Sequence, residues 1–281
     1  MDGGTDIEIL NAPPAGTRFT HAVFDFDGTL STLRQGWEGI MEPMMVRAIL
    51  GGTEADPALT ESVSLAVREY IDRTTGIQTL VQMQGLADLV RRFRRVPESA
   101  ILDEHAYKRI YNATLLDLVN GRLERLRSGA LTPADCMIGG ALSFVGALHA
   151  RGLTLYLASG TDQEDVEREA DVLGFSAYFD GGIFGATGDV SREAKRIVLE
   201  RILGAIGEGA VVTFGDGPVE IRETHRRGGY AVGVASDEIR RQGMNLRKRR
   251  RVIEAGADLV VPDFRRGEEL LALLFSAPPS R

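Results

Sequence analysis

The sequence has 281 residues, of which 43% are hydrophobic and 26% are charged. This composition excludes a disordered chain, and a chain of this length can bury roughly 70–75% of its unfolded surface in one or two domains. The single cysteine, Cys136, excludes an internal disulfide framework and a multi-cysteine zinc site. The net charge of −7 argues against a general nucleic-acid-binding protein, because phosphate backbones must be neutralised by cations.

The N-terminal residues do not have the pattern of a targeting segment. They are acidic at their start and contain no apolar core, so we predict no signal peptide and a loose leader over residues 1–17. The longest largely apolar stretch, 137–150, is too short to span a bilayer and contains His149. We therefore expect a soluble, cytoplasmic protein that does not bind membranes.

The first predicted element is a strand, and a long helical segment follows it. Residues 21–26 form a short apolar run rich in β-forming residues and precede an Asp-Gly pair, which predicts a buried strand. Between residues 37 and 131 apolar residues recur at helical spacing, and glycine and proline breaks separate several candidate helices. We predict no strand there and interpret the segment as an all-helical insertion.

From residue 133 onward, predicted helices and strands alternate. The expected strands cover 153–158, 211–214, 230–234 and 259–261, and the expected helices cover 134–150, 162–173, 191–203, 245–255 and 268–275. Such alternation is typical of parallel βαβ units, so we predict an α/β fold with a doubly wound parallel sheet. Ligands of these folds bind beyond the carboxyl ends of the strands, where the candidate functional residues are sought.

Two aspartates lie at the carboxyl end of the first predicted strand. The two-residue period of a strand places Asp25 and Asp27 on one face, where their like charges call for a cation or a shared proton. Such a pair suits one carboxylate as a nucleophile and the other as a general acid and base. The alternative is a simple turn at Asp27-Gly28, which would not explain a carboxylate at position 25 inside an apolar run.

Two further segments could contact an anion. Ser159 and Gly160 follow the strand 153–158 and can present a hydroxyl and backbone N–H groups, although the alternative is helix capping by Thr161 or Asp162. Lys195 lies in the predicted helix 191–203, where a solvated side chain is the ordinary alternative. Of the 33 basic residues only three are lysines, so a lysine kept among arginines draws attention.

A third acidic group follows the strand 211–214. Asp216 comes directly after this strand, and Glu220 falls in the first turn of a helix that Pro218 can open. Carboxylates that meet at the same sheet edge make a hard-cation site plausible. Mg2+ prefers such oxygen ligands and usually takes one or two carboxylates from the protein.

These four segments, in this order, resemble the motifs of the haloacid dehalogenase superfamily of phosphohydrolases. Asp25-Phe26-Asp27-Gly28-Thr29 is similar to the first motif, Ser159 to the second, Lys195 to the third, and Gly215-Asp216 with Glu220 to the fourth. The resemblance implies an α/β core over residues 18–32 and 133–281. It also implies a helical cap over residues 33–132, placed between the first and second motifs in the C1 arrangement.

The resemblance also implies a role for each matching residue. Asp25 would be the nucleophile, and Asp27 the general acid and base. Mg2+ would be held by Asp25, the Asp27 backbone carbonyl and Asp216. Ser159, Gly160 and Lys195 would bind the phosphoryl oxygens. Thr29 and Glu220 would support these groups, and Glu220 departs from the aspartate that the family often has there.

On this basis we predict an Mg2+-dependent phosphatase that hydrolyses a small phosphorylated metabolite, with sugar phosphates as one candidate class, through an aspartyl-phosphate. Asp27 favours phosphoryl transfer over dehalogenation on family analogy. The first alternative is a sugar phosphomutase that uses the same nucleophile, and the second is a non-catalytic binding module. The sequence does not predict an oligomeric state.

Several other residues are weaker candidates. Arg34 and Trp37 follow the first motif closely and are candidates for substrate contact, although packing is the alternative for Trp37. The basic run 247–251 could be a nucleic-acid patch, but we favour a solvated helix face. The histidines are scattered and do not have metal-ligand spacing. Tyr107, Lys108 and Arg109, in the helical insertion, are further candidates for polar contacts with a substrate.

Overall fold

The fold is described from a computed structural model, over residues 7–52, 56–188, 196–197, 200 and 210–275. Its strands form one sheet in the order β1-β7-β6-β5-β2-β3-β4. All neighbouring strands are parallel except β1, which pairs antiparallel with β7 at one edge. The strands are β1 (Glu8–Ile9), β2 (His21–Phe24), β3 (Thr154–Asp162), β4 (Gly182–Ala186), β5 (Val211–Gly215), β6 (Tyr230–Val234) and β7 (Leu259–Val261).

The register of the central strands determines where the site lies. Phe24, the last residue of β2, pairs with Leu157 on one side and with Phe214 on the other. The residues that follow β2 therefore lie between the end of β3 and the end of β5. This order brings together three segments that are far apart in the sequence.

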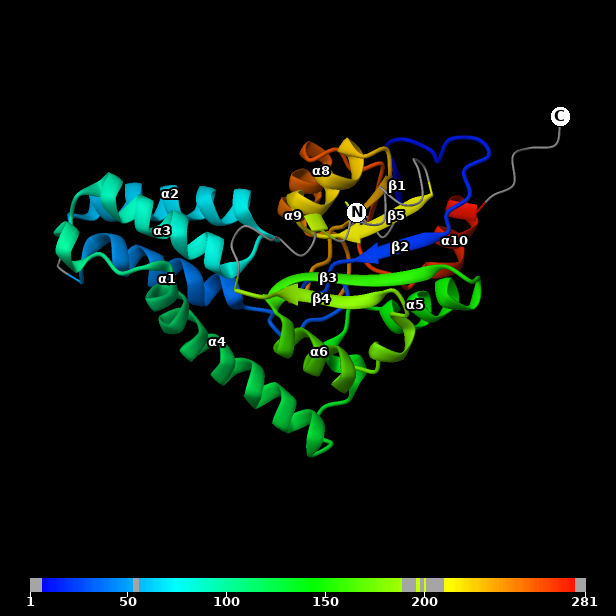
Figure 1. Cartoon of the computed structure of the whole chain (residues 1–281), viewed down its shortest axis with the longest axis horizontal. Coiled ribbons are helices and arrows are strands. Elements are labelled where there is room, and N and C mark those ends of the chain that lie inside the picture. Colours follow the sequence, from blue (N-terminus) through cyan, green and yellow to red (C-terminus); the bar gives the residue numbers. More distant parts are fainter. Residues whose placement is uncertain (1–6, 53–55, 189–195, 198–199, 201–209, 276–281) are drawn as a thin grey trace.

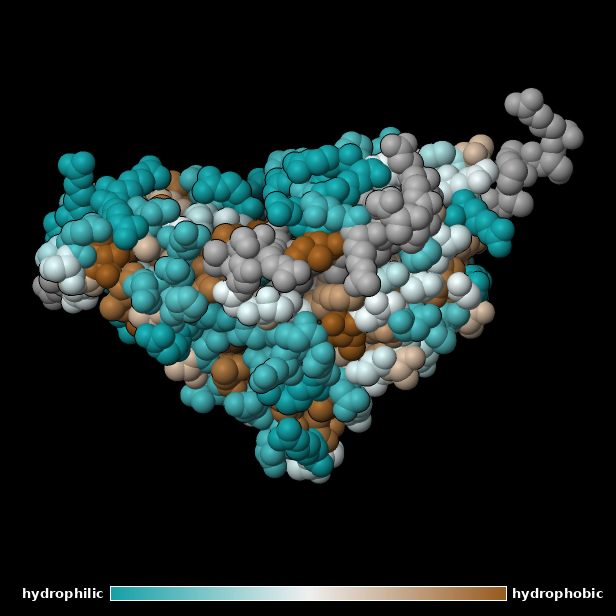
Figure 2. Space-filling view, in the orientation of Figure 1, coloured by the Kyte–Doolittle hydropathy of each residue, from teal (hydrophilic) through white to brown (hydrophobic). Residues whose placement is uncertain are grey.

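Helices cover both faces of the sheet (Figure 1). α8 (Pro218–Arg226) and α9 (Leu246–Glu254) pack on β5, β6 and β7, and their outer surface is mostly hydrophilic in the view of Figure 2. On the other face lie α5 (Ala141–Ala150), α6 (Gln163–Val172) and α10 (Gly267–Phe275). The predicted doubly wound α/β fold is confirmed.

The chain between β2 and β3 is helical, as predicted. We call α1 to α4 the helical segment; it comprises α1 (Trp37–Leu50), α2 (Pro57–Thr74), α3 (Thr79–Phe93) and α4 (Glu104–Arg127). α1 packs on the other three helices, and α3 packs on α4. The arrowheads of β2 and β3 point toward this segment (Figure 1), so it stands beyond the carboxyl ends of these strands.

Local sequence explains where two of these helices begin. The side chain of Asp56 accepts a hydrogen bond from the backbone N–H of Ala58, and Pro57 stands in the first turn of α2. Asp103 accepts from the N–H of Ala106 at the start of α4. Each carboxylate satisfies a donor that the helix itself cannot pair.

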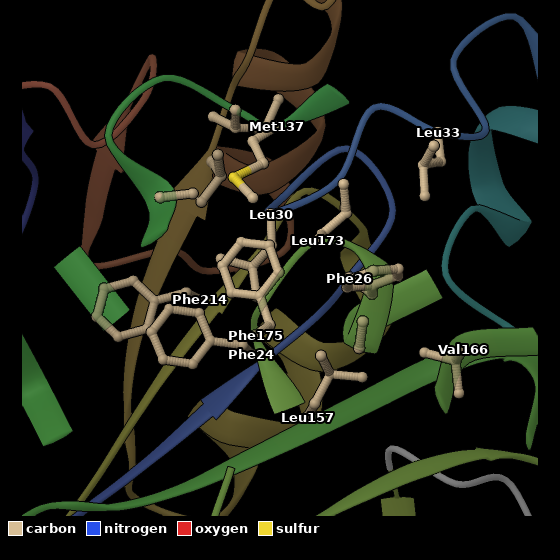
Figure 3. Packing of buried hydrophobic residues seen from close by; sticks show 14 of the residues in the cluster. Phe24, Phe26, Leu30, Leu33, Met137, Leu157, Val166, Leu173, Phe175 and Phe214 are labelled. Carbon is tan, nitrogen blue, oxygen red and sulfur yellow. The ribbon is translucent and has the colours of Figure 1, made fainter. Parts of the chain in front are cut away.

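Aromatic side chains form the centre of the core (Figure 3). The rings of Phe24 and Phe214, from neighbouring strands, stack with their centroids 4.6 Å apart. Phe144 of α5 stacks on Phe264 at 4.9 Å and meets Phe214 edge-on at 5.3 Å. These contacts fix β2 against β5 directly below the residues of the site. Cys136 is buried.

Several elements differ from the predictions. The strand predicted over 21–26 ends at Phe24, and the strand predicted over 153–158 extends to Asp162, so that Ser159 and Gly160 lie within β3. Residues 8–9, expected in a loose leader, form the edge strand β1, and β4 was not predicted because its glycine-rich sequence lacks a strong strand pattern. The helix predicted over 134–150 is wrong in its first part. A short 3-10 helix (Pro133–Cys136) precedes an extended Met137, and Gly140 has a φ of 76° before α5 begins.

The remaining short helices are Glu98–Ala100 and Ser176–Tyr178, both of 3-10 type. Most of the helix predicted over 191–203, including Lys195, lies outside the described residues. Within the described part of the chain, none of the helices combines the length and the apolar character needed to cross a bilayer.

Candidate active site

The candidate site begins at the loop after β2. The backbone N–H of Asp25 donates to the carbonyl of Phe214 at 2.9 Å, so this residue still follows the ladder toward β5. Asp25 is 4% exposed, and its carboxylate accepts a hydrogen bond from the Thr29 hydroxyl at 3.4 Å. Thr29, predicted as a supporting residue, therefore lies beside Asp25.

Asp27 is more accessible than Asp25 and has a different neighbour. Its Oδ2 accepts a hydrogen bond from the hydroxyl of Thr161 at 2.8 Å, across from the end of β3. Sequence reasoning treated Thr161 as a capping residue and missed this contact. The two aspartates thus lie in distinct environments, which is the usual basis for two chemical roles.

The carboxylates of Asp25, Asp216 and Glu220 form a cluster in which one oxygen of each lies within 4.8 Å of the others. All three residues are buried, and Glu220 is 1% exposed. Glu220 Oε1 accepts from the N–H of Gly217 at 2.8 Å, which fixes it at the start of α8. Glu220, predicted as a supporting residue, therefore lies among the carboxylates that could hold a metal ion.

This donor set fits a divalent cation. Buried carboxylates that face one another repel, and a cation bound between them relieves that repulsion. Carboxylate oxygens are hard ligands of the kind that Mg2+ and Ca2+ take in proteins. Among the described residues, the group that could hold a metal contains no histidine or cysteine, which makes a zinc site a poor match.

Arg34 lies close to Asp27 but is held mainly by α6. Its Nη2 donates to Glu169 Oε1 at 2.6 Å, its Nε donates to Glu169 Oε2 at 3.2 Å, and Nη2 lies 3.4 Å from Asp165 Oδ2. Its Nε is 3.9 Å from Asp27 Oδ1. Burial raises the pKa of Glu169 to about 7, although the Arg34 guanidinium acts in the opposite direction.

A cavity of about 80 Å³ lies between the strand ends and the helical segment. On the strand side it is lined by Asp25, Asp27, Ser159, Gly160, Thr161 and Asp216. On the helical side its lining includes Trp37, Ile77, Gln82, Tyr111 and Leu115, and Arg34 also lines it. The structure therefore brings Asp25, Asp27, Arg34, Trp37, Ser159, Gly160 and Asp216 to one cavity.

The connection between α2 and α3 closes over this cavity. A Cβ added to Gly160 would lie 2.6 Å from the carbonyl oxygen of Ile77, so only glycine permits this close approach. Ser159 is 1% exposed, and its Oγ accepts from the N–H of Thr161 at 3.1 Å. Lys195, the fourth predicted catalytic residue, lies outside the described residues.

The interpretation of the basic run 247–251 as a solvated helix face is wrong for Lys248 and Arg251, although Arg247 and Arg250 are exposed. Lys248 and Arg251 are both 8% exposed. The ammonium of Lys248 is 2.8 Å from Asp216 Oδ2, and Arg251 donates through Nη2 to the backbone carbonyl of Asp216 at 3.0 Å. Helical spacing explains the error: residues three apart share a face, and this face of α9 packs onto the site while Arg250 points outward.

The other weak candidates also differ in burial and contacts. Lys108 of α4 pairs with Asp162 at 2.5 Å and so joins the helical segment to the end of β3. Tyr107 is buried, and Arg109 is exposed. No histidine lines the cavity that holds Asp25 and Asp27. Scarcity was the one sequence signal for Lys108 and Lys248, since only three lysines occur.

Comparison with known proteins points to one family. The model of a hydrolase family, described as haloacid dehalogenase-like hydrolase, matches residues 19–223. No curated protein matches the sequence.

Solved structures share the fold at low sequence identity. One is a predicted phosphoglycolate phosphatase from Haemophilus somnus, with 16% identity, a TM-score of 0.58, and coverage of 91% of this chain and 99% of that one. A β-phosphoglucomutase from Clostridium difficile gives 14% identity, a TM-score of 0.58, and coverage of 91% and 97%. A predicted phosphatase from Clostridium acetobutylicum gives 13% identity, a TM-score of 0.56, and coverage of 91% of this chain and 99% of that one.

Gly28 provides a test of the packing around the acidic cluster. Its φ is 76°, and an added Cβ would lie 2.4 Å from Asp216 Oδ2 and 2.8 Å from Lys248 Nζ. Gly28→Ala should therefore cost more free energy of unfolding than Gly174→Ala, which carries a similar φ of 80° with open space around its Cβ. We expect a difference of about 1–3 kcal/mol in urea unfolding, from overpacking alone. Equal losses would show that the close contact has no energetic weight.

The buried Arg34–Glu169 pair provides a second test. Arg34→Met should cost about 3–5 kcal/mol in urea unfolding at pH 8, because Glu169 is then buried without its cation. Replacing both residues by methionine should recover most of this loss.

Burial without Arg34 raises the pKa of Glu169 further above its unfolded value, so the folded state of Arg34→Met binds the proton more tightly than the unfolded state. Its stability should therefore rise as pH falls from 8 to 5. A pH-independent loss would contradict this account.

Proposed function

The chain belongs to the haloacid dehalogenase-like hydrolase family, and from that premise we propose that it is a phosphatase that hydrolyses a small phosphate monoester. The observation that supports this most directly is the pairing of Asp25 and Asp27 at one cavity. Asp25 lies in a buried carboxylate cluster, while Asp27 is hydrogen-bonded to Thr161 and faces the same cavity.

In the first half of the reaction, the Asp25 carboxylate attacks phosphorus. The bond between phosphorus and the ester oxygen breaks, and an aspartyl-phosphate forms on Asp25. Asp27, protonated at this stage, gives its proton to the departing alkoxide. The hydroxyl of Thr161, 2.8 Å from Asp27 Oδ2, holds the carboxyl group in place for that transfer.

In the second half, a water molecule attacks the phosphorus of the aspartyl-phosphate. Asp27, now ionised, takes one proton from this water, and the bond between phosphorus and the Asp25 oxygen breaks. Inorganic phosphate leaves, Asp25 is an anion again, and Asp27 carries the proton needed for the next cycle. Asp27 therefore carries out both proton transfers of the cycle.

The residues that would hold the metal ion are Asp25, Asp216 and Glu220, together with the Asp27 backbone carbonyl that the family resemblance implies. We propose Mg2+ as this ion, because the set consists of oxygen donors. When bound, the ion supplies positive charge that offsets repulsion between an anionic nucleophile and the phosphoryl oxygens.

The phosphoryl oxygens would be bound by Ser159, Gly160 and Lys195. The Ser159 Oγ accepts a hydrogen bond from the N–H of Thr161, so its own hydroxyl hydrogen remains available as a donor. Ser159 and Gly160 both line the cavity. The role of Lys195 stays a prediction from the sequence.

The size of the cavity favours a small substrate, with sugar phosphates as a first class to examine. We propose that the helical segment is a cap over residues 33–132 on a core of residues 18–32 and 133–281. Its α2–α3 connection reaches Gly160, and Trp37 and Tyr111 form part of the wall. Burial raises the pKa of Tyr111, so its phenol stays protonated and able to donate a hydrogen bond to a substrate.

Removal of the proposed nucleophile tests the reaction. Asp25→Asn should reduce phosphate release to the background rate across sugar phosphates, nucleotides and phospho-amino acids, because an amide cannot attack phosphorus as a carboxylate does. Asp171→Asn, an exposed change on α6, is the matched control and should keep the wild-type rate. Normal turnover by Asp25→Asn would exclude Asp25 as the nucleophile. Conversion of a sugar 1-phosphate into the 6-phosphate by the wild-type protein would identify a mutase instead.

Removal of a proposed metal ligand tests the cation site. Asp216→Ala should raise the Mg2+ concentration needed for half-maximal phosphate release by at least about tenfold, since even outer partners of metal ligands carry such effects. The measurement is a Mg2+ titration of initial rates at saturating substrate. An unchanged Mg2+ requirement would show that Asp216 does not bind the cation.

A further inference from the structure

A buried ammonium lies directly beside the proposed metal ligands. Lys248 Nζ is 2.8 Å from Asp216 Oδ2, 2.6 Å from Glu238 Oε1 and 3.1 Å from the Ser236 hydroxyl oxygen. Lys248 is contributed by α9, and the other three residues follow β5 or β6. The sequence motifs of the site do not include it.

The ammonium has no capacity left for a substrate. It carries three donors, and the three acceptors just named use them. The Ser236 hydroxyl in turn donates to the backbone carbonyl of Gly28 at 2.6 Å. Lys248 therefore acts on the residues around it and does not serve as a ligand for the phosphoryl group.

The surroundings explain why this position holds a lysine. A Cβ on Gly28 would lie 2.8 Å from Nζ, so the ammonium is packed against the backbone of the β2 loop. A compact ammonium can reach three acceptors in different directions, whereas a planar guanidinium is larger and directs its donors in one plane. Arginine occupies 30 of the 33 basic positions in this chain, and here it would not fit the contacts.

We propose that Lys248 is a positioning residue that acts through Asp216: it holds the carboxylate and, by its fixed charge, lowers the affinity of the site for the divalent cation. This inference rests on the proposed metal site. The ammonium partly neutralises Asp216 and repels a second cation nearby. Glu238 opposes this effect, because its carboxylate balances the ammonium from the other side.

The position of the ligand loop does not depend on Lys248 alone. Arg251 donates from Nε and Nη2 to the Asp216 backbone carbonyl, at 3.3 and 3.0 Å. With this second anchor in place, removal of the ammonium changes mainly the charge at Asp216. The two changes Lys248→Met and Glu238→Gln should therefore shift metal affinity in opposite directions.

The experiment measures Mn2+ binding to the substrate-free protein by the EPR signal of free Mn2+, with Mg2+ as competitor. Lys248→Met should bind the cation about tenfold more tightly than wild type, and Glu238→Gln about threefold more weakly, as Coulomb interactions at such distances allow. If the two effects add, the double variant should bind the cation about threefold more tightly than wild type. Arg250→Met removes an exposed charge from the same helix and should leave the affinity unchanged.

The outcomes separate the two proposals. If wild type binds no Mn2+ at this site, the proposed metal site is wrong, and this inference fails with it. If wild type binds but Lys248→Met is unchanged or weaker while its circular dichroism stays native, the metal site stands and the role of Lys248 is rejected. Should Lys248→Met not fold, Glu238→Gln decides: weaker binding supports the inference, and unchanged or tighter binding overturns it.

Discussion

The main constraint on this structure is the electrostatic repulsion between carboxylates that lie together at one buried edge of the sheet. Asp25, Asp216 and Glu220 come from the ends of β2 and β5 and the start of α8, and each is almost fully buried. Like charges in such a place are tolerated only when cations and hydrogen bonds offset them. Lys248 lies against Asp216, and on the other side of the site Arg34 lies near Asp27, held by Glu169.

The same charges connect the helical segment to the sheet. Arg251 donates to the Asp216 carbonyl and also, through Nη1, to Asp72 Oδ1 and the Thr75 hydroxyl at the end of α2. Arg247 pairs with Asp72 as well, at 3.2 Å. A guanidinium that supports a proposed metal ligand therefore also holds the connection that closes the cavity. The connection that lines the cavity and the backbone of Asp216 are therefore both hydrogen-bonded to one side chain, Arg251.

Much of this arrangement could be predicted from the sequence. The ends of β2 and β5 could be located approximately, because short apolar runs stop near acidic residues, although the first strand was predicted to reach residue 26 and ends at Phe24. The parallel order then brings Asp25 and Asp216 together. Contacts that depend on tertiary packing were not accessible. The Thr161–Asp27 hydrogen bond and the Arg34–Glu169 pair join residues more than 130 positions apart, and no local pattern encodes them. β4 was missed because pairing with β3, rather than β propensity, makes it a strand.

The basic run of α9 shows why composition misleads at this level. Five consecutive cations suggest one charged surface, yet the helix distributes them over different environments. Lys248 and Arg251, one turn apart, face the site, whereas Arg249 pairs with Glu8 of the edge strand β1 and Arg250 remains exposed. A buried cation is stable only where carboxylates lie close enough to pair with it. The two buried cations of α9 therefore also indicate the acidic edge of the sheet. An isolated lysine within an arginine-rich helix is then a clue to a site where a compact charge is required.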